Sequence, residues 1–250
     1  MHQRAVVERV LKLSEGGLSP SAMAGQTGLP RSTLRDWVQG RLPSSYLEPW
    51  PAAEPRAADL PDSYPYLLGM YLGDGCISRH PREVFRLRIS LDAKYPGIIA
   101  ESKQAIGEAV PGNRVWQGAR ASRYTDRPEK TCVDVGAYSK RWPRLFPQHG
   151  PGKKHERRII LTDWQWEAVS MHPQGALRGL IHSDGCRGIN TGRNWRYPRY
   201  SFHNLSEDIL AIFRAACELV GVHSTNAPGT VYVSRMADVA KLDQFIGPKS

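Results

Sequence analysis

Apolar residues recur at helical spacing in three short runs near the start of the chain. Gly16 and Gly17 end the first run. Ser19 and Pro20 then have the residue types of a helix N-cap and a first helical turn, and Pro30 opens the third run. Met23 and Ala24 of the second run would face inward. The first run has its apolar residues on one helix face, and the third has three apolar residues: Val6, Val7, Val10, Leu11 and Leu13, and Leu34, Trp37 and Val38. The pattern predicts a compact unit of three helices between residues 4 and 40.

The next twenty residues break this pattern because prolines interrupt them at short intervals, at Pro43, Pro49, Pro51, Pro55 and Pro61. Proline lacks a backbone N–H and fixes φ, which excludes regular helix and central strand. We therefore predict three parts: a helical domain over 1–42, a proline-rich linker over 43–62, and a larger domain over 63–250.

In the larger domain the order of predicted elements repeats. Residues 84–92 alternate in polarity, with Leu87 and Ile89 on one face of a strand and Arg86 and Arg88 on the other. Further strands are predicted at 114–125, 130–138, 196–204 and 230–235, and helices at 97–110, 140–146, 163–171, 206–221 and 237–245. This order predicts an α+β fold with two αββαββα repeats, at about 63–160 and 161–250, related by a pseudo-twofold axis.

Each repeat begins with the same short pattern, LLGMYLGDG at 67–75 and LRGLIHSDG at 177–185. Small residues lie four apart in each copy, which puts them on one helix face where two backbones can approach closely. Two such helices packed side by side would bring Asp74 and Asp184 to adjacent ends. Paired carboxylates of this kind can hold a divalent metal ion.

Charge and cysteine usage narrow the classes of function. The 250 residues include 34 Lys and Arg against 24 Asp and Glu, a net charge of +10 that favours a nucleic-acid partner. No apolar stretch approaches the ~20 residues of a membrane span, so no membrane partner is expected. The N-terminus has no apolar signal core, and the cysteines lack CxxC spacing. We expect a cytoplasmic protein, associated with the nucleoid in a bacterial cell.

The paired copies resemble the motifs of LAGLIDADG homing endonucleases in their single-chain, two-motif form. The resemblance covers residues 63–250 and implies a saddle built from two sheets. It departs at the sixth motif position, often acidic in the family, where this chain has Leu72 and His182. The metal-binding Asp of the family is present in both copies.

The resemblance also implies a set of catalytic residues. Asp74 and Asp184 would bind Mg²⁺, with Mn²⁺ as a substitute, and the backbone carbonyl groups of Gly73 and Ser183 would complete its coordination. Each repeat ends with a Gly-Pro and a lysine after its final helix. By resemblance, Lys153 or Lys154 serves the first site and Lys249 the second, where a fixed cation stabilises charge that develops on the phosphate.

Two groups of residues are predicted to contact DNA. Residues 21–38 resemble a helix-turn-helix, whose third helix would present donors to base edges and phosphates in a major groove. A protein-docking module is the alternative for these helices. The first group is Arg31, Ser32, Thr33, Arg35 and Gln39. The second group, on the predicted strands of the saddle, is Arg86, Arg88, Arg120, Arg123, Arg196 and Arg199.

These observations predict a monomeric, metal-dependent, site-specific endonuclease of homing type that cuts double-stranded DNA. One strand would be cut in each half-site. Two alternatives remain open at this point. One is a transcriptional regulator that binds DNA through the same fold without cleaving it, and the other is an RNA maturase that assists splicing.

Overall fold

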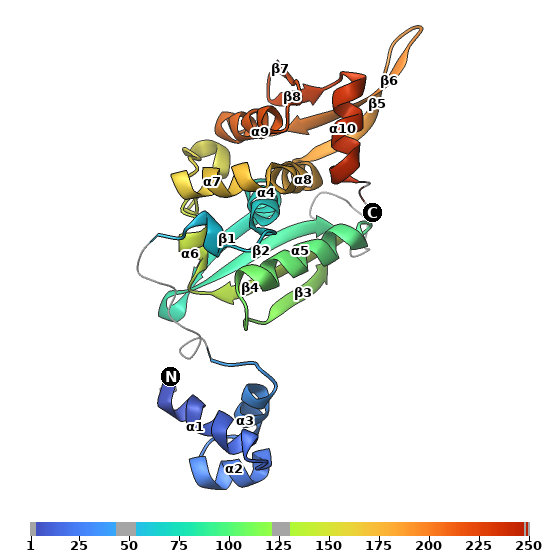
Figure 1. Ribbon diagram of the computed structural model, residues 1–250. Helices are drawn as coiled ribbons and strands as arrows, with labels where there is room; N and C mark the ends of the chain where they lie inside the picture. Colours follow the sequence, from blue (N-terminus) through green and yellow to red (C-terminus); the bar gives the residue numbers. More distant parts are fainter. Residues whose placement is uncertain (1–3, 44–53, 122–130, 248, 250) are drawn as a thin grey trace. The chain divides into compact units, whose positions relative to one another are not determined.

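The computed structural model describes residues 4–43, 54–121, 131–247 and 249. The chain divides into two compact units, residues 1–54 with 110–114 and residues 55–109 with 115–250. Figure 1 labels their helices and strands. Within the described residues, no helix is long and apolar enough to cross a membrane.

The first unit contains three short helices, α1 (Arg4–Glu15), α2 (Pro20–Thr27) and α3 (Arg31–Val38). Ser19 caps α2, because its Oγ accepts a hydrogen bond from the N–H of Ala22 at 3.3 Å. Gly28 ends α2 in the left-handed region, with φ of 69°. Five buried residues form the core of the unit: Val7, Val10, Met23, Leu34 and Trp37. Of the apolar residues of α3, Val38 is 42% exposed at the end of the helix.

The second unit contains the same sequence of elements twice. The first copy comprises α4 (Tyr64–Asp74), β1 (Gly75–His80), β2 (Val84–Asp92), α5 (Pro96–Ala109), β3 (Val115–Arg120), β4 (Cys132–Ser139) and α6 (Trp142–Leu145). The second copy comprises α8 (Pro173–Asp184), β5 (Gly185–Thr191), β6 (Arg196–His203), α9 (Glu207–Leu219), β7 (Thr225–Ala227), β8 (Thr230–Val233) and α10 (Met236–Ile246). An additional helix, α7 (Asp163–Met171), precedes the second copy.

The two antiparallel sheets in the described residues have equivalent topologies. Their strand orders are β1-β2-β4-β3 and β5-β6-β8-β7. The unit is therefore an α+β fold with an internal αββαββα repeat, as predicted from the order of elements. The helices α4 and α8 pack against each other between the two halves, and each sheet with its remaining helices lies on its own side of this pair (Figure 1).

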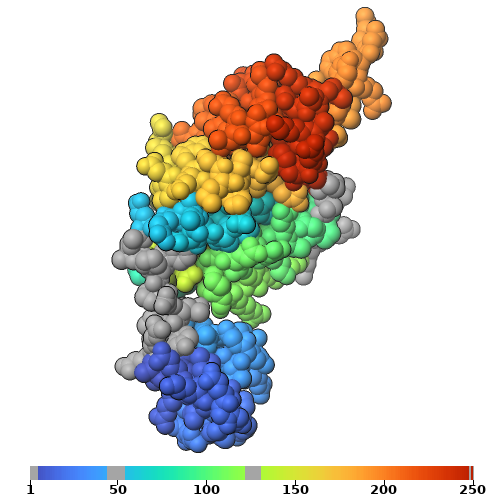
Figure 2. All heavy atoms as spheres, viewed as in Figure 1, coloured from blue at the N-terminus to red at the C-terminus, as the bar shows by residue number. Residues whose placement is uncertain are grey.

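Alternation along the strands separates the core from the opposite face of each sheet. In β2, Leu87 and Ile89 are buried while Arg86 and Arg88 are only half-buried on the other face, as the sequence predicted. In β6, Tyr200 and Phe202 are buried and pack with the α9 and α10 side of the second half. The β5–β6 hairpin extends beyond the rest of this half in Figure 2.

The predicted ends of several elements need correction. The helix expected over 140–146 is only the short α6. It starts at Trp142, where Pro143 fits the first turn, and ends at Leu145, because Pro147 disfavours the helical conformation at Phe146. The strand expected over 114–125 is described as β3 up to Arg120, and its remainder lies partly outside the described residues. Ser206 occupies the N-cap position of α9, but its side chain makes no capping hydrogen bond.

Candidate functional site

The site begins with a close contact between the backbones of the two motif helices. A Cβ added to Gly69 of α4 would lie 2.7 Å from the carbonyl oxygen of Ala176, and one added to Gly179 of α8 would lie 2.2 Å from that of Tyr66. Both distances are far shorter than van der Waals contact, so only glycine fits at either position. The small residues of the paired motifs therefore allow the close approach of the two helix backbones that their spacing predicted.

This contact brings the last residues of the two helices together. A Cβ on Gly73 would lie 2.2 Å from the Oγ of Ser183 and 3.0 Å from Oδ2 of Asp184. The carboxylate at the end of α8 therefore reaches the end of α4, where Asp74 is the terminal residue. Ser183 itself donates its hydroxyl hydrogen to the carbonyl oxygen of Leu180 at 2.9 Å.

The two carboxylates occupy an environment that disfavours their negative charge. Burial, together with the nearby charge of Asp184, raises the pKa of Asp74 to about 7, while the charges of Lys154 and Lys249 oppose the shift. Burial also raises the pKa of Asp184, although a hydrogen bond from Asn204 lowers it. Desolvation and like-charge repulsion are the usual causes of such shifts at functional sites.

Of the two candidate lysines in the first repeat, Lys154 is the one beside the carboxylates. It begins the 3₁₀ turn Lys154–Glu156. Its Nζ donates to the carbonyl oxygens of Tyr71, Leu72 and Gly73 at 2.5, 3.0 and 2.8 Å. Burial lowers the pKa of Lys154 to about 8, against the opposing effect of both aspartates.

Lys153, in contrast, points to solvent, where its ammonium lies 3.4 Å from Glu156 and its side chain is 72% exposed. The sequence left the choice between these adjacent lysines open, and the geometry separates them.

The second repeat contributes Lys249, which follows α10. Its Nζ donates to the carbonyl oxygen of Gly185, the residue after Asp184, at 2.5 Å. Burial lowers the pKa of this lysine, and the charges of Asp74 and Asp184 both oppose that shift. Each motif helix thus ends beside one partly buried lysine.

Asn204, which sequence reasoning missed, distinguishes the two carboxylates. It follows β6 and donates from Nδ2 to Oδ2 of Asp184 at 2.7 Å. Its own Oδ1 accepts from the N–H of Ser206 at 2.8 Å, which fixes the orientation of the amide. Among the described residues, Asp74 has no corresponding donor. Asn204 lies twenty positions from Asp184 outside the paired motifs, so no motif pointed to it.

A cavity of about 410 Å³ opens beside these groups and is lined by both repeats. The first repeat contributes the end of α4, the start of β1 and the loop around Lys154, and the second contributes Asp184 and residues 203–205. Cys76 lines the cavity and Cys186 is also exposed; both thiols are free.

The donor set fits a small divalent cation that prefers oxygen ligands. No group of three His, Cys, Asp or Glu side chains converges in the part of the chain that the structure describes. Mg²⁺ does not need such a group, since it commonly binds one or two carboxylates and retains several waters or substrate phosphate oxygens. The raised pKa of Asp74 shows that its surroundings disfavour the negative charge of the carboxylate, and a bound cation would stabilise that charge. The carbonyl of Gly73, predicted as a ligand, already accepts a hydrogen bond from Lys154.

The arginines of the first sheet are partly neutralised by a buried acid. Arg120 donates from Nε to Asp134 at 3.0 Å, and Arg88 lies 3.9 Å from the same carboxylate. Arg86 lies over the ring of Trp116, with its guanidinium carbon 5.9 Å from the ring centre. Arg123 lies outside the described residues. The sequence placed these arginines on strands but contained no indication of Asp134 as their partner.

The arginines of the second sheet lie on opposite faces of β6. Tyr200 and Phe202, which alternate with Arg199, are buried, and Arg199 lies over Tyr232 with its guanidinium carbon 4.3 Å from the ring centre. Arg196 is exposed at the start of the strand. Both arginines were predicted to contact DNA. They are three residues apart on the strand, so their side chains lie on opposite faces of the sheet.

In the first unit, the predicted recognition residues occupy and follow α3. Arg31, Ser32 and Arg35 are exposed, and Thr33 is partly buried. Gln39 lies one residue beyond the helix, where it accepts a hydrogen bond from Arg41. Gln39 is exposed as well.

No protein-family model matches the sequence, and no curated protein matches it. Solved structures with a similar fold include the LAGLIDADG meganuclease I-AabMI bound to uncleaved DNA, with 11% identity, a TM-score of 0.42, and coverage of 72% of this chain and 82% of that one. The N-terminal LAGLIDADG domain of DUF199/WhiA has 14% identity, a TM-score of 0.45, and coverage of 77% and 88%. The I-SmaMI LAGLIDADG homing endonuclease bound to cleaved DNA has 9% identity, a TM-score of 0.41, and coverage of 73% and 83%. These structures belong to the family that the paired motifs resemble. Their sequence identity to this chain is too low to assign its function, which has to be argued from its own residues.

Proposed function

We propose that this protein is a site-specific double-strand DNA endonuclease that hydrolyses phosphodiester bonds with a divalent metal ion. The observation that carries the proposal is the pair Asp74 and Asp184 at adjacent helix ends. The pKa of each carboxyl is raised, and a partly buried lysine from each repeat lies beside the pair. A merely structural helix contact would not require two partly buried carboxylates next to two partly buried ammonium groups, since each is costly to desolvate.

Duplex DNA is the substrate that fits the two-part organisation. The net charge of +10 favours a polyanion. The two repeats of the second unit have equivalent sheets on opposite sides of the motif helices. The strands of a duplex are related by a twofold axis, so one repeat can act on each strand. A single chain therefore supplies both halves, which supports a monomer.

The residues divide the chemistry among them. Asp74 and Asp184 would hold Mg²⁺, or Mn²⁺ in its place, and the bound ion supplies charge neutralisation at the phosphate and a more acidic water. Lys154 and Lys249 keep a positive charge beside the phosphate while negative charge develops on it. Asn204 fixes the orientation of the Asp184 carboxylate through its hydrogen bond.

The first unit is proposed as a helix-turn-helix that binds DNA next to the cleavage site. Its exposed α3 residues Arg31, Ser32 and Arg35 would face the major groove. Its role would be affinity, because a tethered second module raises the effective concentration of the first.

The proposal is tested by cleavage of a randomised plasmid library with Mg²⁺ and with EDTA, followed by assays on the selected site. We expect Asp74→Asn and Asp184→Asn each to lower the cleavage rate at least ~100-fold, because an amide cannot replace a carboxylate that holds a cation. DNA affinity should change little, since most of it comes from phosphate contacts elsewhere. Asp163→Asn, an exposed aspartate at the start of α7, is the matched control. Cleavage at the wild-type rate by both site variants would refute the proposal.

The two adjacent lysines give a second, sharper comparison. Lys154→Met should lower the rate strongly, whereas Lys153→Met should leave it nearly unchanged, since Lys153 is exposed and its ammonium lies beside Glu156. Equal effects of the two substitutions would contradict the assignment of Lys154.

Two results would favour the alternatives. Sequence-specific DNA binding without cleavage in any metal ion would favour a transcriptional regulator. Preferential binding of a structured RNA over duplex DNA, without cleavage, would favour an RNA maturase.

A further inference from the structure

The two motif copies differ in polarity at two equivalent positions. The second position is Leu68 in α4 and Arg178 in α8, and the sixth is Leu72 in α4 and His182 in α8. Both leucines are buried, and so is His182, while the Arg178 side chain is 30% exposed. Polar groups in such positions are stable only if their hydrogen-bonding groups are satisfied. The second copy must therefore provide partners that the first copy does not need.

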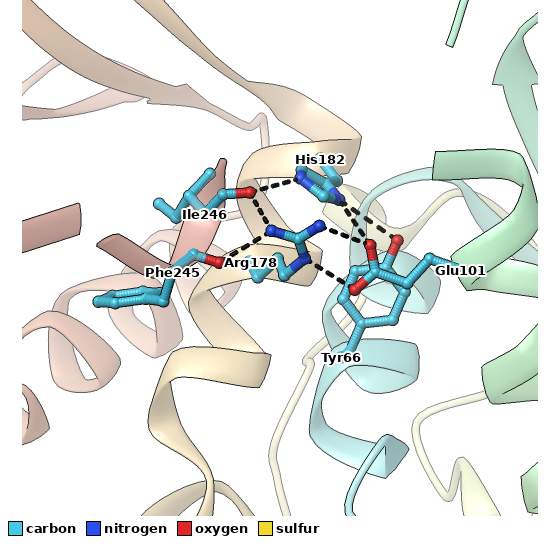
Figure 3. Close-up of polar contacts among 6 residues, drawn as sticks. All are labelled: Tyr66, Glu101, Arg178, His182, Phe245 and Ile246. Carbon is cyan, nitrogen blue, oxygen red and sulfur yellow. Dashed lines mark hydrogen bonds and ion pairs between the residues drawn. The ribbon is translucent and has the colours of Figure 1, made fainter. Parts of the chain in front are cut away.

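Arg178 joins three elements of the fold (Figure 3). Its Nε and NH2 donate to the two carboxylate oxygens of Glu101, on α5 of the first repeat, at 2.7 and 2.9 Å. Its NH1 donates to the carbonyl oxygens of Phe245, at 2.8 Å, and Ile246. A planar guanidinium with five donors suits this arrangement, since it can bind a carboxylate with one edge and carbonyls with another.

His182 holds the same carbonyl from the other side. Its Nε2 lies 3.1 Å from the oxygen of Ile246 and, because a carbonyl only accepts, must carry the hydrogen. Its Nδ1 then accepts from the hydroxyl of Tyr66, 3.3 Å away on α4. Burial and the neighbouring Arg178 lower the pKa of His182 to about 4, so the ring is neutral in this arrangement.

The carbonyls held in this way belong to the last turn of α10. Such carbonyls have no partner within their own helix, and a positive charge beside them is favourable. The chain then turns at Gly247, with φ of 68°, where a Cβ would lie 3.3 Å from NH1 of Arg178. Lys249 follows two residues later and donates to the carbonyl of Gly185. The position of the α10 end therefore determines whether Lys249 can reach the carboxylate pair.

The first repeat positions its lysine differently. Lys154 starts a 3₁₀ turn and donates to three successive carbonyls at the end of α4, so its ammonium is held directly. Lys249 has one such carbonyl contact among the described residues. The apolar Leu68 and Leu72 of the first copy are consistent with this difference, since no helix end has to be held there.

We propose that Arg178 and His182 are positioning residues, which hold the carbonyl end of α10 so that Lys249 reaches the second half of the site. Glu101 of the first repeat fixes the orientation of Arg178 through two hydrogen bonds, so the position of Lys249 in the second repeat depends on the first repeat. The inference rests on the proposed nuclease function, in which Lys249 serves the cleavage of one DNA strand.

A strand-resolved cleavage assay tests the role in catalysis. With a different label on each strand of the selected site, Lys249→Met identifies the strand that depends on Lys249. Arg178→Leu, which introduces the residue type of the first copy, should slow cleavage of that same strand ~10–100-fold relative to the other, because a shift of about 1 Å in a catalytic group has effects of this size. Arg214→Leu is the matched control, since Arg214 on α9 is 26% exposed and pairs with the exposed Glu207 of its own helix.

The histidine allows a rescue experiment. His182→Leu removes the donor to Ile246 and should shift the ratio between strands in the same direction. His182→Gln keeps an N–H donor at a similar reach and should restore much of the wild-type ratio. This pair also keeps the proposal testable if Arg178→Leu fails to fold.

Hydrogen exchange provides a readout that needs no cleavage. The backbone amides of Ile246, Gly247 and Lys249, followed by mass spectrometry of the C-terminal peptide, should exchange faster in Arg178→Leu and His182→Leu and at the wild-type rate in Arg214→Leu. If the wild-type protein cuts no DNA, the proposed function fails, and the exchange result still decides whether the end of α10 is held in this way. Equal slowing of both strands, or unchanged exchange in both leucine variants, would overturn the inference.

Discussion

Alanine at Gly69 or Gly179 should force the two motif helices apart. A Cβ on Gly69 would lie 2.6 Å from the backbone nitrogen of Leu180 and 2.7 Å from the carbonyl oxygen of Ala176. At Gly179 the contact with the Tyr66 carbonyl oxygen would be 2.2 Å. Ordinary contact begins at 3.4 Å, so the helices would have to separate by 3.4 − 2.6 = 0.8 Å in the first variant and 3.4 − 2.2 = 1.2 Å in the second. Backbone atoms cannot rotate out of the way as a side chain can.

The expected effect on stability is the balance of two opposing contributions. Insertion of a methyl group into a tightly packed contact typically costs about 1–3 kcal/mol. Alanine favours the helix by up to ~1 kcal/mol over glycine. We therefore expect each variant to lose up to about 2 kcal/mol of unfolding free energy, with the larger loss for Gly179→Ala because its contact is shorter.

Urea denaturation of the full chain, followed by circular dichroism, measures this loss. Gly107→Ala is the control, since Gly107 also lies in a helix of the second unit and its Cβ would meet only Val115 at an ordinary 3.7 Å. That variant should be more stable than the wild type by up to ~1 kcal/mol. The cleavage rate should fall in the two motif variants, because the separation also moves Asp74 away from Asp184. If Gly69→Ala and Gly179→Ala are both as stable as Gly107→Ala, the backbone contact is not as close as described.

Three further outcomes are expected. The pKa of Asp74 is raised to about 7, so the metal-free folded protein keeps a proton that the unfolded chain loses near pH 4, and stability should fall as the pH rises between these values. Thermal unfolding in EDTA at pH 5 and pH 8 should show this loss in the wild type and less of it in Asp74→Asn; an identical loss would contradict the assigned environment. Replacing a sheet arginine that contacts phosphate, such as Arg86 or Arg199, by alanine should reduce the slope of log K against log salt by ~0.9, and one that reads a base should lower affinity by ~1–3 kcal/mol; unchanged values across all of the predicted sheet arginines would remove them from the interface. Deletion of residues 1–45 should weaken binding to a long site without moving the cut, and an insoluble product or a shifted cut would indicate that these helices support the second unit instead.

The fold was predictable to a large extent because its signals are local. The alternation in 84–92 and the two copies of the motif depend only on residues close in sequence, and they indicated the strand faces, the repeated order of elements and the contact through Gly69 and Gly179. Ends of elements were less predictable: α6 occupies only the four residues between the start that Pro143 favours and the end that Pro147 enforces at Phe146.

The site was predictable only as far as its motifs extend. Asp74 and Asp184 lie inside the paired motifs, so the sequence alone brought them together. The choice of Lys154 over Lys153 depends on the direction of a 3₁₀ turn, which no residue pattern specifies. Asn204 and Asp134 act through partners that are distant in sequence, and a single sequence contains no record of such pairs.

The ion pair between Glu101 of the first repeat and Arg178 of the second also makes each repeat pack preferentially with the other rather than with a copy of itself. Counted from the buried pairs that begin α5 and α9, the residue of the second repeat equivalent to Glu101 is Ile212, which is buried. Two copies of the second repeat would therefore bring Arg178 against an apolar side chain, and two copies of the first would leave Glu101 facing Leu68. Both like-with-like pairings leave a partly buried charge unmatched, which is the kind of penalty that enforces specificity. Separately expressed halves of this chain should therefore assemble as a heterodimer, with each half selecting the other over a copy of itself.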